Sequence, residues 1–600
     1  MTVPALRADG LLRVFSEAGV LAAADVQVAA RLGALTGEHD DRVLLAAALT
    51  VRGTRLGSMT LDLAEVAESV SADPADAGNA STEAGKTPLP WPDRPAWEQA
   101  CAASPLTRPG EGDGCPLRQV GTRLWLDRYW RQEAFVAEEL LRRAQSADDG
   151  SGATDAVLAE LFGPDDGDQR AAAAGAIAAR ISVIAGGPGT GKTTTIARLV
   201  ATVCRLQPST RVALAAPTGK AAVRMEQAVR TAGPPLSEAD RHRLAGLRAM
   251  TLHRLLGRLP GRASRFRHNR DNRLPFDLVI VDEASMVSLT LMARLLEALP
   301  PSTRLVLVGD PDQLASVEAG AVLGDVVEAG PALPGVVQRL GTTWRFQGHI
   351  AALAELVRAG DAEASLRLLA EQPAGLEFYP IEDGGPLTGA AQDRLRRVVA
   401  QERQIIAAAE AGDDRAALAG LDRHRLLCAH RSGPRGVQHW STLAQRWLAA
   451  AEGDPAGRRE THYVGQPLLM TENDYENELY NGDTGVVIER AGQLLGLFGR
   501  GAAPITVPLS RLTGVRPLHA MTVHRAQGSQ FDEVTVLLPL PDSPLATRQT
   551  FYTAITRASR LVRVIGSPAA VLACVNRPAA RATALRERLE RRLTAESWSG

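Results

Sequence analysis

Lysine is nearly missing from this chain, and aromatic residues are few. Of 67 basic residues only three are lysine: Lys86, Lys192 and Lys220. Aromatic residues make up 4% of the 600 residues, and the 68 acidic residues nearly balance the basic ones. The formal net charge of −1 does not by itself indicate a nucleic-acid-binding protein. It does not exclude one either, because such binding depends on local clusters of charge.

Cysteine and long apolar segments are also scarce. The chain has five cysteines, and none lies within four residues of another, so a CxxC metal site has no support and a disulfide framework is not expected. No run of 18 apolar residues is found, and the start of the chain lacks a basic segment followed by an apolar core. We therefore expect no membrane span, no secretion signal and a cytoplasmic location.

Two of the three lysines lie in glycine-preceded turns, GTGKT and PTGKA. An ammonium group is a compact point charge, whereas the guanidinium that replaces it elsewhere in the chain is a broad planar fork. Retained lysine suggests sites where the fork would not fit, with chance as the alternative explanation.

The pattern of apolar residues divides the chain into domains. Helical spacing dominates residues 1–70, whereas residues 71–118 are rich in Pro, Gly, Ser and Asp, which predicts a linker or a large mobile insertion. Short β-rich runs alternate with amphipathic helices in two blocks, which predicts two parallel sheets covered on both faces. The predicted division is an N-terminal helical domain (1–118), a connecting segment (119–164), a first parallel-sheet domain (165–340), a second (341–454 and 516–600) and an inserted β-barrel (455–515).

A glycine-rich turn predicts a nucleotide-binding site. The stretch GGPGTGKT follows a predicted strand, opens a predicted helix and fits the pattern G-x-x-x-x-G-K-[ST]. Its backbone N–H groups can turn inward around phosphates, and the helix adds its positive N-terminal end. Lys192 is expected to reach the β- and γ-phosphate oxygens and Thr193 to bind Mg²⁺. The predicted loop residues are Gly186, Gly187, Pro188, Gly189, Thr190, Gly191, Lys192, Thr193 and Thr194.

Two adjacent acids complete this site. Asp282 ends the apolar strand of LVIVDEAS, where its carboxylate can hold Mg²⁺ through water, and Glu283 can orient or deprotonate the attacking water. Loop and acids together predict an ATPase with ATP and Mg²⁺ as cofactors. They leave open a transporter, a kinase-like enzyme, a ring ATPase or a nucleic-acid motor.

The order of further motifs resembles superfamily 1 helicases, and their details resemble the RecD family of subunits of the RecBCD complex, exodeoxyribonuclease V. The motifs are VALAAPTGKAAVRM, TLHRLLG, LVGDPDQLASV, TTWRF, ELYNGDTGVV, AMTVHRAQGSQFDEV and FYTAITRAS. The resemblance is strong from about residue 115 to the end, weak over 1–70 and absent over 71–110. It implies an α/β fold with two RecA-like domains, an inserted SH3-like barrel and an N-terminal helical domain that docks on the complex.

The same resemblance implies roles for single residues. The residues implied to touch or sense the nucleotide are Gln169, Asp310, Gln313, Arg345, Arg557, Gln527 and Gly528. Those implied to act in catalysis are Lys192, Asp282, Glu283, Gln313, Arg345 and Arg557. Those implied to contact single-stranded DNA are Pro217, Thr218, Lys220, Thr251, His253, Thr522 and His524. Thr251, Thr522 and the two histidines have an alternative interpretation as helix caps or buried polar groups.

The implied function is an ATP-dependent 5′→3′ DNA helicase or translocase subunit in double-strand-break repair. It would act on the 5′-ended strand of a duplex end, in a heterotrimer with RecB-like and RecC-like subunits. We find no cluster of acidic residues and a lysine that would indicate a nuclease site, and we expect nuclease activity in another subunit. A stand-alone RecD-like helicase and a non-unwinding, ATP-gated DNA-binding subunit are the alternatives. The arginine-rich stretch 261–273 could contact phosphates, or it could be a solvated loop or a partner contact.

Overall fold

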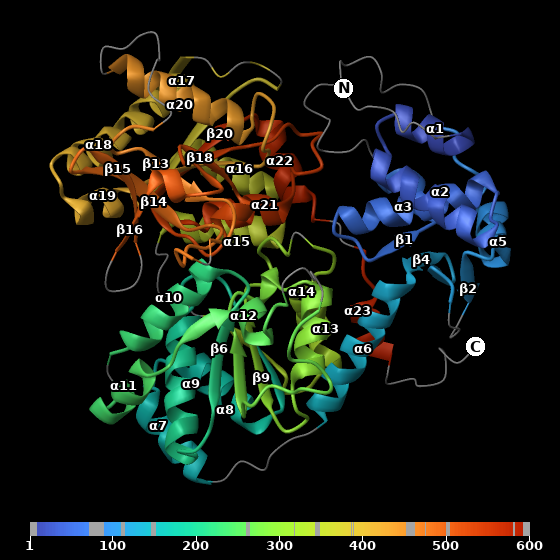
Figure 1. Ribbon diagram of the computed structural model, residues 1–600, viewed down its shortest axis with the longest axis horizontal. Helices are drawn as coiled ribbons and strands as arrows, with labels where there is room; N and C mark the ends of the chain where they lie inside the picture. The colour runs from blue at the N-terminus through green and yellow to red at the C-terminus, as the bar shows by residue number, and fades with distance from the viewer. Residues whose placement is uncertain are drawn as a thin grey trace.

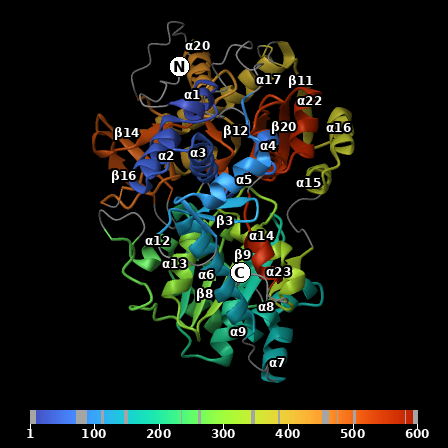
Figure 2. The same cartoon turned by 90° about the vertical axis from the view of Figure 1, so that its right-hand side faces the viewer.

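Within the residues that it describes, the computed structural model contains four sheets, two of them parallel throughout (Figures 1 and 2). In Figure 1 the two parallel-sheet regions lie one above the other, and the N-terminal region lies beside them. No helix within the described residues is both long and apolar enough to cross a bilayer. The structure describes residues 9–70, 89–109, 114–145, 152–233, 235–259, 265–316, 318–341, 348–383, 385, 387, 389–451, 462–474, 476–499, 504–579 and 582–591.

The N-terminal region combines helices with a small sheet of strand order β1-β4-β3-β2. Asp40 begins α3 by accepting a hydrogen bond from the Arg42 backbone N–H, the usual role of an aspartate N-cap. The core of this region buries Phe15, Trp97 and Cys101. Its elements are α1 (Gly10–Glu17), α2 (Ala23–Thr36), α3 (Asp41–Arg55), β1 (Thr60–Asp62), α4 (Val66–Ser69), α5 (Arg94–Ala103), β2 (Thr107–Pro109), β3 (Leu117–Val120) and β4 (Arg123–Leu126).

Part of the predicted linker folds into this core. Helix α5 and strand β2 lie within residues 71–118, so the prediction of one linker or mobile insertion is wrong for residues 89–109. Trp97 and Cys101 lie four residues apart on one face of α5, and both are buried. The composition of the stretch hid this short amphipathic pattern. The sheet also crosses the predicted boundary at residue 118, because β3 lies on both sides of it. The remaining linker residues, 71–88 and 110–113, lie outside the described residues.

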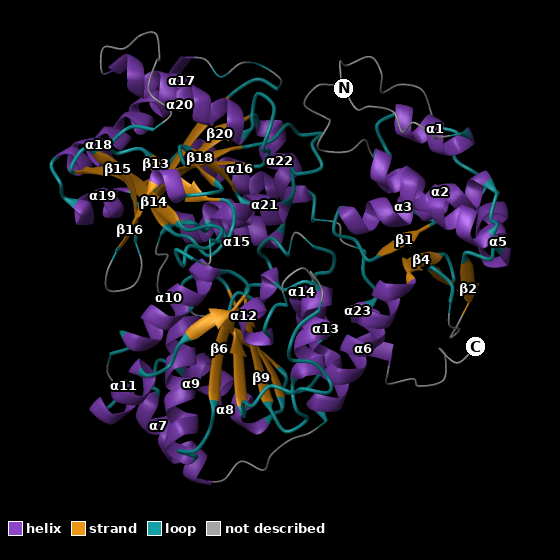
Figure 3. Cartoon of the chain, viewed as in Figure 1, coloured by secondary structure: helices purple, strands orange, loops and turns teal. Residues whose placement is uncertain are grey.

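The first parallel sheet has the strand order β10-β5-β9-β8-β6-β7. The predicted strands ISVIAG, VALAAP, LVIVDE and RLVLVGD are confirmed as β5, β6, β8 and β9. Strands β6 and β8 of this sheet are apolar along their whole length, as expected where helices cover both faces (Figure 3). The strands are β5 (Ile181–Gly186), β6 (Val212–Ala216), β7 (Ala249–Thr251), β8 (Leu278–Val281), β9 (Arg304–Gly309) and β10 (Val337–Leu340).

The helices of the first parallel-sheet domain include two from the predicted connecting segment 119–164. Helix α6 packs against α13 on one face of the sheet, and α7 packs against α9 on the other. The segment therefore contributes to the core rather than only joining two domains. The helices are α6 (Asp127–Ala144), α7 (Gly152–Leu161), α8 (Gly167–Ala178), α9 (Lys192–Leu206), α10 (Gly219–Arg230), α11 (Glu238–Ala245), α12 (Leu252–Leu256), α13 (Leu289–Ala298) and α14 (Val322–Glu328).

The second parallel sheet has the strand order β11-β20-β19-β12-β18. Helices α15, α16, α21 and α22 contribute to the apolar core on one face, and α17 and α20 to the core on the other. The elements are α15 (His349–Ala359), α16 (Ala362–Glu371), β11 (Leu376–Pro380), α17 (Gly389–Val399), β12 (His424–Cys428), α20 (Val437–Ala451), β18 (Ala520–Thr522), β19 (Phe531–Leu537), α21 (Arg548–Ile555), β20 (Ala558–Gly566) and α22 (Pro568–Asn576).

An antiparallel sheet is inserted between β12 and β18 of the second domain, in the order β16-β15-β14-β13-β17. It lies where the sequence predicts an inserted β-structure, and its identity as an SH3-like barrel stays a prediction. Two earlier helices, α18 and α19, share an apolar cluster with β14 and β15. The elements are α18 (Arg403–Glu410), α19 (Asp414–Gly420), β13 (Pro467–Met470), β14 (Thr484–Arg490), β15 (Gln493–Phe498), β16 (Ile505–Pro508) and β17 (Val515–Pro517).

The C-terminal segment leaves the second domain and packs on the first. After α22, residues 582–591 contain α23 (Leu585–Arg591), which contacts α6 and α14 and buries Leu585 and Leu589 in the first domain's core. The predicted assignment of all residues 516–600 to the second domain is therefore corrected for this segment. Two apolar leucines in a short charged helix gave too weak a pattern to locate its partner.

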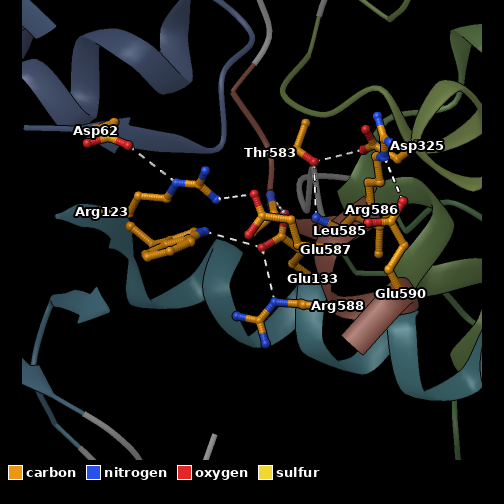
Figure 4. A network of polar contacts seen from close by, with 12 residues as sticks. Asp62, Arg123, Glu133, Asp325, Thr583, Leu585, Arg586, Glu587, Arg588 and Glu590 are labelled. Atoms are coloured by element: carbon orange, nitrogen blue, oxygen red, sulfur yellow. Dashed lines mark hydrogen bonds and ion pairs between the residues drawn. The ribbon is translucent and has the colours of Figure 1, made fainter. Parts of the chain in front are cut away.

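We call residues 582–591 and their polar contacts the C-terminal interlock (Figure 4). Glu133 on α6 is fully buried and accepts hydrogen bonds from the Ala584 backbone N–H at 2.8 Å and the Arg588 Nε at 3.3 Å. Thr583 donates to Asp325 on α14 at 2.8 Å. On the N-terminal sheet, Arg123 pairs with Glu587 at 2.7 Å. The interlock thus joins the N-terminal region, the first parallel-sheet domain and the segment that follows the second parallel-sheet domain.

Candidate functional site

The glycine-rich turn has the geometry of a phosphate-binding loop. Strand β5 ends at Gly186 and helix α9 begins at Lys192. Gly189 and Gly191 have φ values of +82° and +81°, a region that residues with a side chain rarely adopt. A Cβ at Gly191 would also lie 2.5 Å from the Gln169 Nε2. Both backbone conformation and space therefore require glycine at this position.

The Lys192 ammonium lies across the loop. It donates hydrogen bonds to the carbonyl oxygens of Gly186 and Gly187, at 2.7 and 2.8 Å. Thr190 also donates to the Gly187 carbonyl, at 2.9 Å. Phosphate oxygens bound here would offer the ammonium acceptors that carry a full charge, which form stronger hydrogen bonds than neutral carbonyls. Lys192 is thus placed to bind an anion in this loop.

Two further loop residues lie on the first turn of α9. Thr193 is half-buried and Thr194 is exposed, and Pro188 lies in the turn before them. Gln169 on α8 is buried against the loop, and its Oε1 lies 3.5 Å from an Arg198 nitrogen that also pairs with Asp166 at 2.7 Å. Its predicted contact with adenine remains a prediction.

The two predicted acids follow β8, the strand next to β9 in the sheet. Burial and the neighbouring Glu283 raise the pKa of Asp282 to about 6, while Lys192 opposes the shift. Glu283 has a φ of +51°, an unusual conformation for a residue with a side chain, and its N–H donates to Asp282 Oδ1 at 2.8 Å. Backbone strain of this kind costs about 1–3 kcal/mol and concentrates at functional sites.

Asp282 and Thr193 are the residues that could hold a metal ion. The part of the chain that the structure describes contains no group of three or more His, Cys, Asp or Glu side chains with metal-binding geometry. Mg²⁺ needs few protein ligands, because it keeps several waters and binds phosphate oxygens. A carboxylate, a hydroxyl and a phosphate loop fit Mg²⁺ that arrives with a nucleotide.

Asp310 lies close to the place where the two parallel-sheet domains meet. It follows β9 of the first domain, is buried, and accepts a hydrogen bond from Gln313 Nε2 at 2.8 Å. Burial raises the pKa of Asp310, and both Lys192 of the first domain and Arg557 of the second domain lower it. The loop lysine and the predicted arginine therefore both lie near this carboxylate, although neither of these described residues forms an ion pair with it. We call this region, with Asp282, the nucleotide crevice.

Arg557 is buried at the C-terminal end of α21. Its guanidinium donates to the carbonyl oxygens of Thr553 at 3.1 Å and Ser529 at 3.3 Å. Burial lowers the pKa of Arg557, and Glu283 and Asp310 raise it. The second predicted arginine, Arg345, lies outside the described residues.

The three threonines predicted to contact DNA each accept a hydrogen bond from a backbone N–H three residues later. Thr218 caps α10 by accepting from Ala221, and Thr251 caps α12 by accepting from Arg254, both at 3.2 Å. Thr522 accepts from Arg525 at 3.3 Å. These contacts agree with the alternative interpretation of Thr251 and Thr522, the cap at Thr218 was not anticipated, and DNA contact by all three stays a prediction.

The remaining predicted DNA contacts lie on the same loops. Pro217 precedes the cap of α10, and Lys220 lies in its first turn; His253 is in α12, and His524 follows β18. Burial lowers the pKa of Lys220 to about 8, while Asp422 and Asp483 of the second half of the chain oppose the shift. Since a Cβ at Gly219 would lie 2.8 Å from Tyr480, this turn packs closely against the inserted sheet.

Several contacts across the crevice were not predicted. Gln527, predicted to face the nucleotide, donates from Nε2 to the Leu314 carbonyl at 2.5 Å. Gly528 accepts a hydrogen bond from Arg224 through its carbonyl. Thr553 accepts from the Leu314 N–H at 2.9 Å, and a Cβ at Gly187 would lie 3.2 Å from the Tyr552 hydroxyl. Both Thr553 and Tyr552 belong to the motif FYTAITRAS, which was the only sequence signal for them.

Three family profiles match separate parts of the chain. The N-terminal domain of the RecBCD enzyme subunit RecD matches residues 17–125, an AAA domain matches residues 169–319, and a UvrD-like helicase C-terminal domain matches residues 517–565. The first falls on the N-terminal region, and the other two fall on the two parallel-sheet domains.

Whole proteins similar to this chain were also found. The RecBCD enzyme subunit RecD of Mycolicibacterium smegmatis is 50% identical over 96% of this chain and 99% of its own. The ATP-dependent RecD2 DNA helicase of Deinococcus radiodurans is 34% identical over 68% of this chain and 50% of its own. Among solved structures, the Pif1 helicase from Bacteroides bound to ADP-AlF3 and single-stranded DNA has a TM-score of 0.38 at 15% identity, covering 70% of this chain and 95% of its own.

Proposed function

Since this chain belongs to the RecD family of RecBCD enzyme subunits, we propose that it is the ATP-dependent DNA helicase subunit of a RecBCD-type complex. It moves 5′→3′ on the 5′-ended strand from a duplex end, in double-strand-break repair and recombination. The observation that carries the proposal is the contact between the two domains beside the phosphate loop, where Thr553 and Gln527 of the second domain bind Leu314 of the first and Arg557 donates to Thr553. A contact of this kind makes hydrolysis depend on how the two domains approach each other.

The residues of the crevice divide the work of hydrolysis. Lys192 and the loop N–H groups bind the phosphates, while Thr193 and Asp282 hold Mg²⁺, which neutralises charge on the phosphate oxygens when it is bound. Glu283 orients the attacking water. Arg557, together with Arg345, brings positive charge from the second domain, an effect worth about 10³–10⁵ in rate in related phosphoryl transfers.

Domain movement then displaces DNA. The predicted DNA contacts lie on both domains, with Pro217, Thr218, Lys220, Thr251 and His253 on the first and Thr522 and His524 on the second. If both sets hold one strand, closing and reopening the crevice moves one set along it. Opening a base pair costs about 1.4 kcal/mol of stacking, which one nucleotide turnover per step can supply. In this scheme the inserted sheet, as an SH3-like barrel, belongs to the second domain.

The N-terminal region is the proposed docking surface for RecB-like and RecC-like partners. The exposed large apolar side chains of the described residues all lie on its first three helices or next to them: Val14, Val28, Leu35 and Leu56. Exposed apolar side chains gathered in one region are typical of protein contacts. We place the resulting heterotrimer in the cytoplasm and its nuclease activity in another subunit.

The two alternatives have less support. The chain covers 99% of the RecD subunit of M. smegmatis but only 50% of the RecD2 helicase of D. radiodurans, so the subunit is the better match in length. An ATP-gated subunit that binds DNA without unwinding it would need neither an acid that orients water nor an arginine that faces the transferred phosphate. Glu283 and Arg557 both lie at the crevice, which favours turnover.

Strand displacement on a 5′-tailed duplex tests the proposal, with the chain alone and with its RecB-like and RecC-like partners. Lys192→Ala is expected to abolish ATP hydrolysis and unwinding by this subunit while complex formation persists, because the anion-binding ammonium is lost. Arg211→Ala is the matched control, since it removes an exposed charge that pairs with Asp277 at the opposite end of β6. Unwinding retained in Lys192→Ala, or displacement only on a 3′-tailed duplex, would contradict the proposal.

A further inference from the structure

Leu314 of the first parallel-sheet domain is held on three sides by the second. Its N–H donates to Thr553 Oγ1 at 2.9 Å, its carbonyl accepts from Gln527 Nε2 at 2.5 Å, and both contacts are buried. Its side chain is 5% exposed and belongs to the apolar core cluster of the second domain. Both hydrogen-bonding groups of one peptide residue are thus bound by side chains from the other domain. We call this arrangement the Leu314 clamp.

On the first-domain side, Gln313 links the Leu314 clamp to the nucleotide crevice. Leu314 follows Gln313 directly, and Gln313 donates to Asp310 at 2.8 Å. The Gln313 Oε1 is buried without a hydrogen-bond partner among the described residues. A buried acceptor without a partner is costly, so this amide has one acceptor available for a group that enters the crevice. A change in the position of the Asp310 or Gln313 side chain can therefore move Leu314, because Gln313 contacts Asp310 and is joined to Leu314 by one peptide bond.

The clamp is attached to two functional segments of the second domain. Thr553 accepts a hydrogen bond from Arg557 through its carbonyl oxygen, at 3.1 Å, while its hydroxyl holds Leu314. Gln527 follows Thr522 and His524, the predicted DNA contacts, in a short turn after β18. One side chain of the clamp therefore leads to the phosphate-facing arginine and the other to the DNA-contacting loop.

We propose that Thr553 and Gln527 are positioning residues whose grip on Leu314 couples the γ-phosphate side of the crevice to the DNA-contacting loop. This inference rests on the proposed helicase function and names the contact that transmits it. When the grip is intact, binding of DNA by the loop stabilises the arrangement of Asp310, Gln313 and Arg557 that hydrolyses ATP. When it is broken, each domain still binds its ligand, but occupancy of one site no longer changes the other.

The test compares Thr553→Val with wild type in the full-length chain. Valine keeps the shape of threonine but cannot accept the Leu314 hydrogen bond. Stimulation of ATP hydrolysis by single-stranded DNA is expected to fall about tenfold, within the range of typical coupling between two sites. Binding of a fluorescent ATP analogue and of labelled single-stranded DNA should each change by less than about twofold. Thr553→Ser retains the hydroxyl and should restore stimulation.

The outcomes separate the clamp from the function on which it rests. Full stimulation in Thr553→Val, or an equal loss of both ligand affinities together with stability, would overturn the clamp, because coupling would then be absent or merely structural. Wild type that shows neither DNA-stimulated hydrolysis nor unwinding would instead overturn the proposed function. Gln527→Glu, which replaces the donor facing the Leu314 carbonyl by an acceptor, provides a second variant with the same expected loss of stimulation.

Discussion

The nucleotide crevice and the C-terminal interlock both join parts of the chain that are far apart in sequence, but they use different contacts. Across the crevice, side chains of one domain hold backbone groups of the other, as Gln527 and Thr553 hold Leu314. In the interlock, the fully buried Glu133 pairs with Arg588, and Leu585 and Leu589 enter the first domain's core.

The hydrogen bonds across the crevice and the buried ion pair of the interlock differ in energy. A single hydrogen bond contributes about 0.5–1.5 kcal/mol net, so the contacts across the crevice can break and reform during a cycle. Removing one partner of a buried ion pair costs about 3–5 kcal/mol. We therefore expect the interlock to hold the N-terminal region, α6 and α14 together more strongly than the contacts across the crevice hold the two parallel-sheet domains. Three variants test this contrast.

Arg557→Ala should have the largest effect, on turnover far more than on nucleotide binding. Because Arg557 brings a positive charge of the second domain close to Asp310 and Glu283 of the first, its loss should lower kcat about 10³–10⁵-fold. Affinity for a nonhydrolysable ATP analogue should change only a few-fold, since Lys192 and the loop remain. Steady-state hydrolysis and equilibrium binding measure the two quantities. Arg560→Ala, on an exposed position of β20, is the control. Equal losses of binding and turnover would mean that Arg557 is only structural.

Glu133→Ala should have the next largest effect, and on stability alone. It leaves Arg588 without its buried partner and removes the acceptor of the Ala584 N–H, which should cost about 3–5 kcal/mol. Thermal unfolding measures the loss, and kcat per folded molecule should stay within about twofold. Glu587→Gln, which breaks the more exposed pair with Arg123, should cost less than about 1 kcal/mol. A drop in kcat without loss of stability would remove the contrast between the two regions.

Asp325→Asn should have the smallest effect, visible as a change with pH. Burial raises the pKa of Asp325 from 3.8 to about 7, although Thr583 donates a hydrogen bond to it. An acid with a raised pKa in the folded state contributes most stability below pH 3.8, and this contribution is lost as the pH rises through about 7. Asparagine lacks this dependence, so the variant should gain about 1–2 kcal/mol relative to wild type between pH 5.5 and 8. If the difference in unfolding free energy between the variant and the wild type were the same at both pH values, the raised pKa of Asp325 would be refuted.

Local sequence patterns predicted much of the site. The spacing of glycines before Lys192 and the apolar run before Asp282 identified the loop and the acids, because backbone geometry and strand ends depend on neighbouring residues. The alternation of strands and helices predicted both parallel sheets and the inserted β-structure. The resemblance to a helicase family added Asp310 and Arg557, which the structure brings to one crevice.

Contacts between distant segments were not predictable in this way. Nothing near Thr553 indicates that its hydroxyl meets Leu314, which lies 239 residues earlier. Gln527 was assigned to the nucleotide from its motif, but its amide holds the same peptide. Helix α5 was hidden in a Pro- and Gly-rich stretch, and α23 has only two apolar anchors, so their partners became visible only in the packed molecule.

The sequence by itself determined the chemistry of each segment: a glycine-rich loop with the pattern of a phosphate site, acids at the end of an apolar strand, and strands apolar enough to be buried. Those properties follow from residue type and from spacing within a few turns of the chain. Only the tertiary structure decided which segments meet, so that Gln527 and Thr553 of the second domain bind Leu314 of the first and the C-terminal segment returns to the first domain. Side-chain contacts across domains depend on the packing of whole sheets, and no local pattern encodes them.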